Sequence, residues 1–105
     1  MKTIFVKTND NRAELTKFIH RLEKHADKVL NNPVICERYL DTDNYNTIMG
    51  ELKDAVAIDD FDIFIIGVDS KEITTLNVLE NINRAHTLTC EVDDFNSAKN
   101  FIVML

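Results

Sequence analysis

Residues 61–70 (FDIFIIGVDS) limit the possible folds more than any other stretch of this sequence. Positions 63–68 are apolar apart from one glycine, whereas a strand with one solvent-exposed face alternates between apolar and polar residues. A short unbroken run, rich in β-branched and aromatic residues, is typical of a strand that is buried on both faces. We therefore expect a central strand of a parallel sheet here, with layers packed on both sides of it.

The rest of the chain alternates between short apolar segments and longer amphipathic ones. The amphipathic segments repeat their apolar residues at three- and four-residue spacing, which indicates helices with one buried stripe. Glu37 and Arg38 interrupt one of the apolar segments, so we expect that strand to lie nearer an edge of the sheet. Strands are expected over residues 3–7, 34–40, 61–70 and 87–92, and helices from Arg12, from Tyr45, over residues 72–85 and after a cap at Asp94.

This alternating order predicts parallel pairing through right-handed crossovers. The 105 residues are enough for one domain with its own core. We predict a single three-layer α/β/α domain over residues 1–105, with a four-stranded, mostly parallel sheet in the order 2-1-3-4. In this order the carboxyl ends of the first and third strands lie side by side, which is where open α/β sheets usually bind their ligands.

The composition argues against several classes of function. A net charge of −6 is unfavourable for direct nucleic-acid binding, which depends on clustered Lys and Arg. Cys36 and Cys90 have no Cys or His partners at metal-ligand spacing, so we expect buried, reduced thiols and neither a metal nor another cofactor. No apolar run reaches membrane-spanning length and no signal segment is recognisable, so a cytoplasmic protein without membrane contact is expected.

Polar residues follow the first and third predicted strands, where the ends of these strands meet. We expect Thr8, Asn9, Asp10, Asp69 and Ser70 to line one crevice there. Thr8 or Ser70 can serve as a nucleophile, with Asp69 as a base or metal ligand. A hydroxyl nucleophile needs an activating base and donors for the oxyanion, and neither a histidine nor a glycine-rich turn is placed to supply them. Asp69 and Ser70 are also ordinary caps for a following helix, so both interpretations stay open.

Two strand ends also carry patterns that match a known family in outline. Residues 5–9 (FVKTN) end the first strand, and residues 61–73 (FDIFIIGVDSKEI) contain the central one. They resemble the Y-x-R-x-S and D-R-x-x-R motifs in the N-terminal catalytic domain of the serine recombinases, the resolvase and invertase family. Residues 42–56 resemble the helix before the second motif, and residues 76–94 the helix and strand after it. The similarity is an ordered pattern that extends over nearly the whole chain.

The departures from these motifs imply a domain that has lost its chemistry. The family attacks a DNA phosphate with the motif serine and holds the phosphate oxygens with arginines. Asp69 matches the motif aspartate, but Asn9 stands at the serine position and Lys7 at the first arginine position. Ser70 and Ile73 stand where the two arginines of the second motif are expected. The resemblance therefore implies no strand cleavage.

We accordingly expect a catalytically inactive resolvase-like domain, from a phage or other mobile element, that works by protein contact. It is expected to self-associate as a dimer or to bind a recombinase or another host or phage protein. The apolar end of the last helix motivates this expectation, because an exposed apolar run needs either a core or a partner. The expected interaction surface consists of Phe101, Ile102, Met104 and Leu105.

Two other functions are alternatives. One is a small DNA-processing hydrolase or nuclease that uses Thr8, Asp69 and Ser70. The other is an acidic protein that mimics DNA through residues 41–62 and thereby inhibits a DNA-binding partner. Activity on supercoiled DNA distinguishes the first alternative, and salt-sensitive competition with DNA for a basic partner distinguishes the second.

Overall fold

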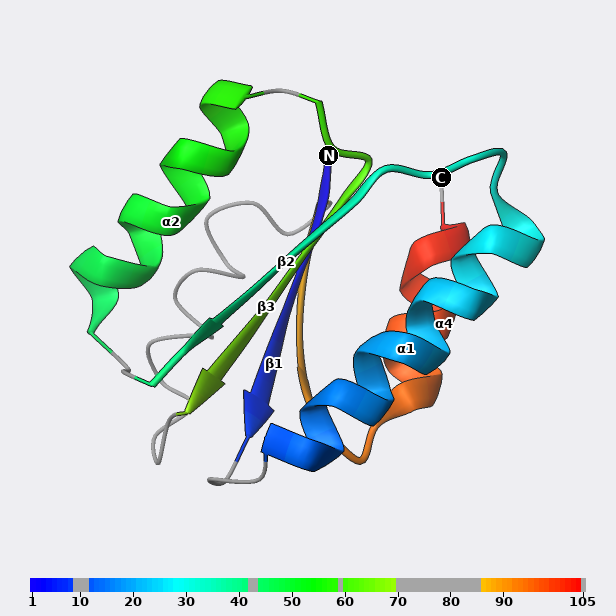
Figure 1. Ribbon diagram of the computed structural model, residues 1–105, viewed down its shortest axis with the longest axis horizontal. Coiled ribbons are helices and arrows are strands. Elements are labelled where there is room, and N and C mark those ends of the chain that lie inside the picture. The colour runs from blue at the N-terminus through cyan, green and yellow to red at the C-terminus, as the bar shows by residue number, and fades with distance from the viewer. Residues whose placement is uncertain (9–11, 42–43, 59, 70–85, 105) are drawn as a thin grey trace.

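The computed structural model describes residues 1–8, 12–41, 44–58, 60–69 and 86–104 of the chain (Figure 1). The predicted helix over residues 72–85 lies outside the described residues. The other predicted strands and helices are present close to their expected bounds. They are β1 (Lys2–Thr8), α1 (Arg12–Val29), β2 (Ile35–Leu40), α2 (Tyr45–Ile58), β3 (Ile63–Asp69), β4 (Thr87–Glu91) and α4 (Phe95–Val103).

The four described strands form one sheet in which every pairing is parallel. This confirms the predicted α/β class and the neighbouring position of the first and third strands at the centre. The predicted order 2-1-3-4 has the correct outer strands but exchanges the two central ones, because the observed order is β2-β3-β1-β4. In both strand orders, right-handed crossovers place α1 on one face of the sheet and α2 on the other. The hydrophobic pattern of the sequence therefore could not distinguish the two orders.

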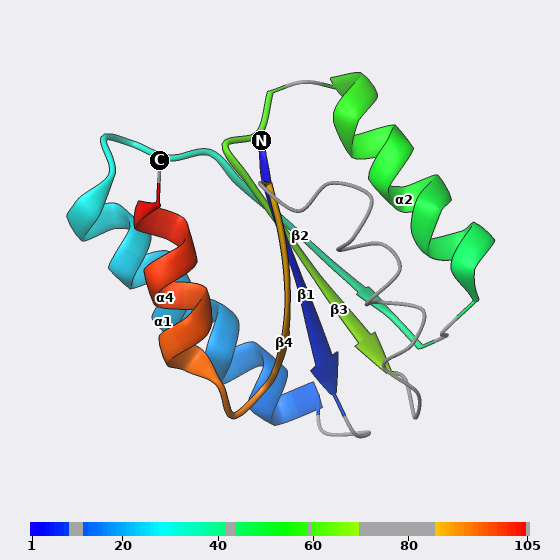
Figure 2. The same cartoon turned by 180° about the vertical axis from the view of Figure 1, so that it is seen from behind.

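The helices lie on both faces of the sheet, as the predicted three layers require. α1 and α4 pack side by side on one face, and α2 covers the other (Figures 1 and 2). Both central strands are buried on both faces, which confirms the interpretation of residues 61–70. On the α1 side the core includes Ile4, Val6, Leu15, Phe18, Leu22, Ile63, Ile65 and Phe101, and on the α2 side Phe5, Ile48, Phe64, Ile66 and Val68.

Gly67 of β3 lets α1 approach the carboxyl end of the sheet closely. A Cβ atom at this position would overlap Leu15 Cδ2 and would lie 3.0 Å from Leu15 Cδ1. Leu15 is buried in the first half of α1, and its side chain would have to shift to make room for this atom. The glycine therefore permits the close packing of this strand against this helix.

Polar side chains hold both ends of α4. Asp94 caps α4 as predicted: Oδ2 accepts a hydrogen bond from Ser97 Oγ at 2.7 Å, and Oδ1 accepts from the Ser97 backbone N–H at 3.4 Å. At the other end of α4, Lys2 Nζ donates to the carbonyl oxygens of Phe101 at 2.7 Å and Ile102 at 2.9 Å, and also to that of Met104. Lys2 thus satisfies carbonyl groups that a helix leaves without internal partners.

Candidate functional site

The carboxyl ends of β1 and β3 lie side by side, as the sequence predicts. Thr8 is the register partner of Asp69 in the parallel ladder that joins the two strands. Asn9, Asp10 and Ser70, the other residues of the predicted crevice, lie outside the described residues. The structure therefore brings together one candidate nucleophile and the candidate acid at the level of the backbone.

Thr8 is buried too deeply to act as an accessible nucleophile. Its exposed fraction is 0%, and Oγ1 has no hydrogen-bond partner among the described residues. A buried hydroxyl without a partner destabilises a fold, because it has lost its bonds to water and has gained none in return. Attack on a substrate would require this end of the sheet to open.

Lys7, which stands at the first arginine position of the resolvase motif, already has an acidic neighbour. Its Nζ lies 4.0 Å from Oε1 of Glu91, and its side chain is only 15% exposed. The two residues are register partners, because β4 pairs with β1. The predicted strand order would have put β4 beside β3 instead, so sequence reasoning missed this pair. No local signal around Glu91 indicates which strand it adjoins.

The opposite edge of the sheet, where the strands begin, carries an apolar depression that we call the amino-end hollow. Its volume is about 550 Å³. Segments from the start of β1, the end of α1, the start of β3 and the end of α4 meet there (Figure 1). Its apolar lining consists of Met1, Leu30, Pro33, Ile63, Ile102, Val103 and Met104.

The predicted interaction surface is only partly available at this hollow. Phe101 and Ile102 are 5% and 2% exposed, so their assignment to an exposed surface is wrong. The helical repeat explains the difference, because these two residues share a face with the buried Ala98 and pack in the core with α1. Met104 is 55% exposed and borders the hollow, while Leu105 lies outside the described residues.

A second, smaller depression lies between α1 and β2, and we call it the β2 groove. It has a volume of about 190 Å³ and is lined by Arg12, Leu15, Thr16, Ile19 and His20 of α1 and by Glu37, Arg38 and Tyr39 of β2. The guanidinium carbon of Arg12 lies 4.1 Å from the centre of the Tyr39 ring, which is close enough for a cation–π contact.

Two acidic side chains meet beside the β2 groove. Burial is the main cause of a raised pKa of Glu23, and a hydrogen bond from its carboxyl group to that of Glu37 raises this pKa further. The positive charge of His20 acts in the opposite direction. Sequence reasoning missed this site, although the charged residues of the edge strand marked its position.

The described residues include no group of three or more His, Cys, Asp or Glu placed to hold a metal ion. None of the helices in the described ranges combines the length and hydrophobicity needed to span a lipid bilayer. No family model matches the sequence, and neither a curated protein nor a solved structure matches it.

Proposed function

We propose that this chain is a resolvase-like domain without catalytic activity, from a phage or other mobile element, that acts by protein contact. It self-associates or binds a recombinase or another host or phage protein. The order of its segments and the parallel pairing of β1 with β3 are compatible with the resemblance. The burial of Thr8 and the ion pair of Lys7 support the absence of catalysis, because a phosphodiester needs an accessible nucleophile and free cations.

The amino-end hollow is the observation that carries the protein-contact proposal. Val103 and Met104 expose about half of their side chains beside it, and Val34 and Val29 add exposed apolar surface at the same end of the domain. A depression and projecting apolar side chains in one patch suit an isologous dimer, in which each copy inserts side chains into the hollow of the other. A second copy of the chain is therefore the first partner to test.

Light scattering over a series of protein concentrations tests this proposal. The chain is expected to form dimers, and Met104→Lys is expected to shift the equilibrium to the monomer. Val56→Lys is the matched control, because Val56 is 57% exposed but belongs to α2, on the opposite face of the sheet. A chain that stays monomeric at every concentration, or equal effects of the two lysines, would contradict self-association through the hollow.

A DNA-processing hydrolase is the second candidate, and the register pairing of Thr8 with Asp69 favours it. This function predicts nicking of supercoiled DNA by the purified chain. The nicking must disappear in Asp69→Ala and in Thr8→Val while the folded content, measured by circular dichroism, stays unchanged. Nicking that survives both substitutions would come from a contaminating nuclease.

A further inference from the structure

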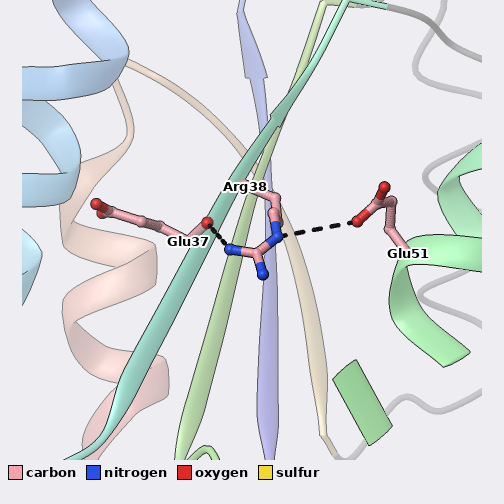
Figure 3. Close-up of polar contacts among 3 residues, drawn as sticks. All are labelled: Glu37, Arg38 and Glu51. Carbon is pink, nitrogen blue, oxygen red and sulfur yellow. Dashed lines mark hydrogen bonds and ion pairs between the residues drawn. The ribbon is translucent and has the colours of Figure 1, made fainter. Parts of the chain in front are cut away.

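β2 lies at one edge of the sheet and presents backbone groups to the outside. Each residue of Ile35–Leu40 is matched with a residue of β3 on the inner side, and no other described strand pairs with the outer side. The carbonyl oxygen of Glu37 accepts a hydrogen bond from Nη1 of the Arg38 side chain at 2.8 Å (Figure 3). An edge of this kind can be extended by another strand.

The β2 groove runs beside this edge and can take the side chains of an added strand. Its volume of about 190 Å³ is below the roughly 300–1,000 Å³ of a typical small-molecule pocket, so it suits one or two side chains of a peptide. Leu15 and Ile19 are buried residues of the lining and give the groove an apolar floor. Arg12, stacked on Tyr39, supplies a cation at one end.

Charge complementarity specifies the side chains that the groove accepts. Residues along a strand alternate between faces, so Glu37 lies on the α1 side together with Tyr39 (Figure 3). Glu37 lines the groove, and its carboxyl group contributes to the raised pKa of Glu23, so a cation bound beside Glu37 would reduce the repulsion between these two acidic groups. Tyr39 lies two residues further along the strand, and the positively charged Arg12 guanidinium stacked on it would attract an anionic side chain.

A second copy of this chain is a poor occupant of the β2 edge. Suppose that the β2 strands of two copies pair antiparallel, so that the two sheets become one continuous sheet. Residues directly opposite each other then have their side chains on the same side of that sheet. Only two registers pair most of β2 in this way, and they set either Glu37 opposite the partner's Glu37 or Arg38 opposite the partner's Arg38. Like charges directly opposite each other are destabilising. The Arg38 side chain extends toward α2 on the other face of the sheet, where Nε lies 4.0 Å from Oε2 of Glu51 (Figure 3).

We propose that the open edge of β2 and the β2 groove bind an extended peptide that carries a basic side chain opposite Glu37 and an acidic one two residues away, facing Arg12. The peptide adds a fifth strand beside the four described ones, and its alternate side chains enter the groove. This surface is separate from the amino-end hollow, so the proposal does not depend on self-association.

A set of end-blocked peptides tests this specificity with the full chain. The peptides share a Thr/Val background and carry Lys, Glu or Thr, in every combination, at two positions two residues apart. Peptides that combine Lys and Glu are expected to bind about tenfold more tightly than those with two Glu or two Thr, which corresponds to about 1.4 kcal/mol. Their binding is expected to shift the backbone amide resonances of Ile35–Leu40.

Charge reversal of the edge strand supplies the decisive comparison. Glu37→Lys is expected to reverse the preference at the facing position from Lys to Glu, and Glu37→Gln to abolish it. Glu51→Lys makes the same change on the other face of the sheet and should leave the preference intact, as should Met104→Lys at the amino-end hollow. Equal binding of all peptides, no binding, or a preference that persists in Glu37→Lys would overturn the proposal.

Discussion

The two ends of the sheet differ in accessibility and chemistry. At the carboxyl end, Thr8 is buried and Lys7 is paired with Glu91. At the amino end, the hollow is open, mainly apolar and bordered by the exposed Met104. Parallel α/β sheets usually place their chemistry at the carboxyl end. Here the described part of that end is packed like a core, and the surface suited to binding lies at the other end.

This difference shows that a parallel α/β architecture does not by itself determine which end of the sheet carries a binding surface. Helix α1 closes the carboxyl end through Leu15, which packs directly onto Gly67. At the amino end, Lys2 bonds to the last carbonyl groups of α4 and holds the helix terminus beside the hollow. The comparison is therefore open to tests that disturb one end and leave the other intact.

Replacing Gly67 with alanine should produce the largest effect. We expect Gly67→Ala to lower the free energy of unfolding by about 1–3 kcal/mol, because the new methyl group overlaps the Leu15 side chain. Leu15→Ala is itself destabilising because it truncates a buried side chain, but the double variant should lose less than the sum of the two single losses, since the atoms that clash are gone. Urea denaturation of the two single variants and the double variant measures the coupling between the sites.

Gly50 of α2 is the matched control for this substitution. A Cβ atom at Gly50 has no heavy atom within 4 Å outside its own helix turn. Gly50→Ala should therefore stabilise the chain by about 1 kcal/mol through helix propensity. A similar loss of stability in both variants would show that the Leu15 contact does not close the carboxyl end.

The next effect concerns the buried hydroxyl at the same end. Thr8→Val replaces a hydroxyl that has no hydrogen-bond partner among the described residues with a methyl group of similar shape, and we expect the free energy of unfolding to rise by about 1–2 kcal/mol. Thermal and urea denaturation measure this change. A loss of stability instead would mean that Thr8 Oγ1 has a hydrogen-bond partner, and the description of this end as a sealed core would be wrong.

The centre and one edge of the sheet could be predicted because they depend on local patterns. The apolar run of residues 63–68 requires cover on both faces, and Glu37 and Arg38 mark an edge. The side on which each outer strand joins depends on long-range packing, and both possible orders bury the same helix stripes. The pairing of Lys7 with Glu91 follows from that choice and was therefore beyond sequence reasoning.

The candidate sites show the same limit. Thr8 and Asp69 could be placed side by side because both central strands were identified. The amino-end hollow combines residues from several segments, such as Met1, Leu30 and Met104, that carry no distinctive pattern individually. Phe101 and Ile102 were assigned to the surface because an apolar run at the end of a helix does not reveal which of its residues face the core.

At the amino end, Lys2→Met should have a smaller effect than the changes at Gly67 and Thr8. It removes the ammonium group that bonds to the α4 carbonyl groups but keeps the apolar part of the side chain. We expect a loss of about 0.5–1 kcal/mol in the free energy of unfolding, as for other cations at helix C-termini. Amide hydrogen exchange should increase in the last turn of α4 and stay unchanged in α1. Unchanged exchange in α4 would contradict the capping role.

The smallest effect is expected beside the β2 groove. Because the pKa of Glu23 is raised in the folded state, that state binds protons more readily than the unfolded chain. Protonation of Glu23 therefore stabilises the fold, and this contribution is fully present at pH values below the unfolded pKa. It is lost as the pH rises through the folded pKa. Glu23→Gln should therefore be more stable than the original chain at neutral pH, by a few tenths of a kcal/mol, because the pair lies near the surface.

This gain should disappear as the pH falls below about 4.3, the ordinary pKa of an unfolded glutamic acid, because the carboxyl group is then protonated in both states and resembles the amide. Urea denaturation across this pH range measures the difference between Glu23→Gln and the original chain. Asp54→Asn, an exposed substitution on α2 with the same change in charge, should show no such pH-dependent gain. Equal pH profiles for the two variants would mean that net charge, and not the contact between Glu23 and Glu37, sets the pH dependence at the β2 groove.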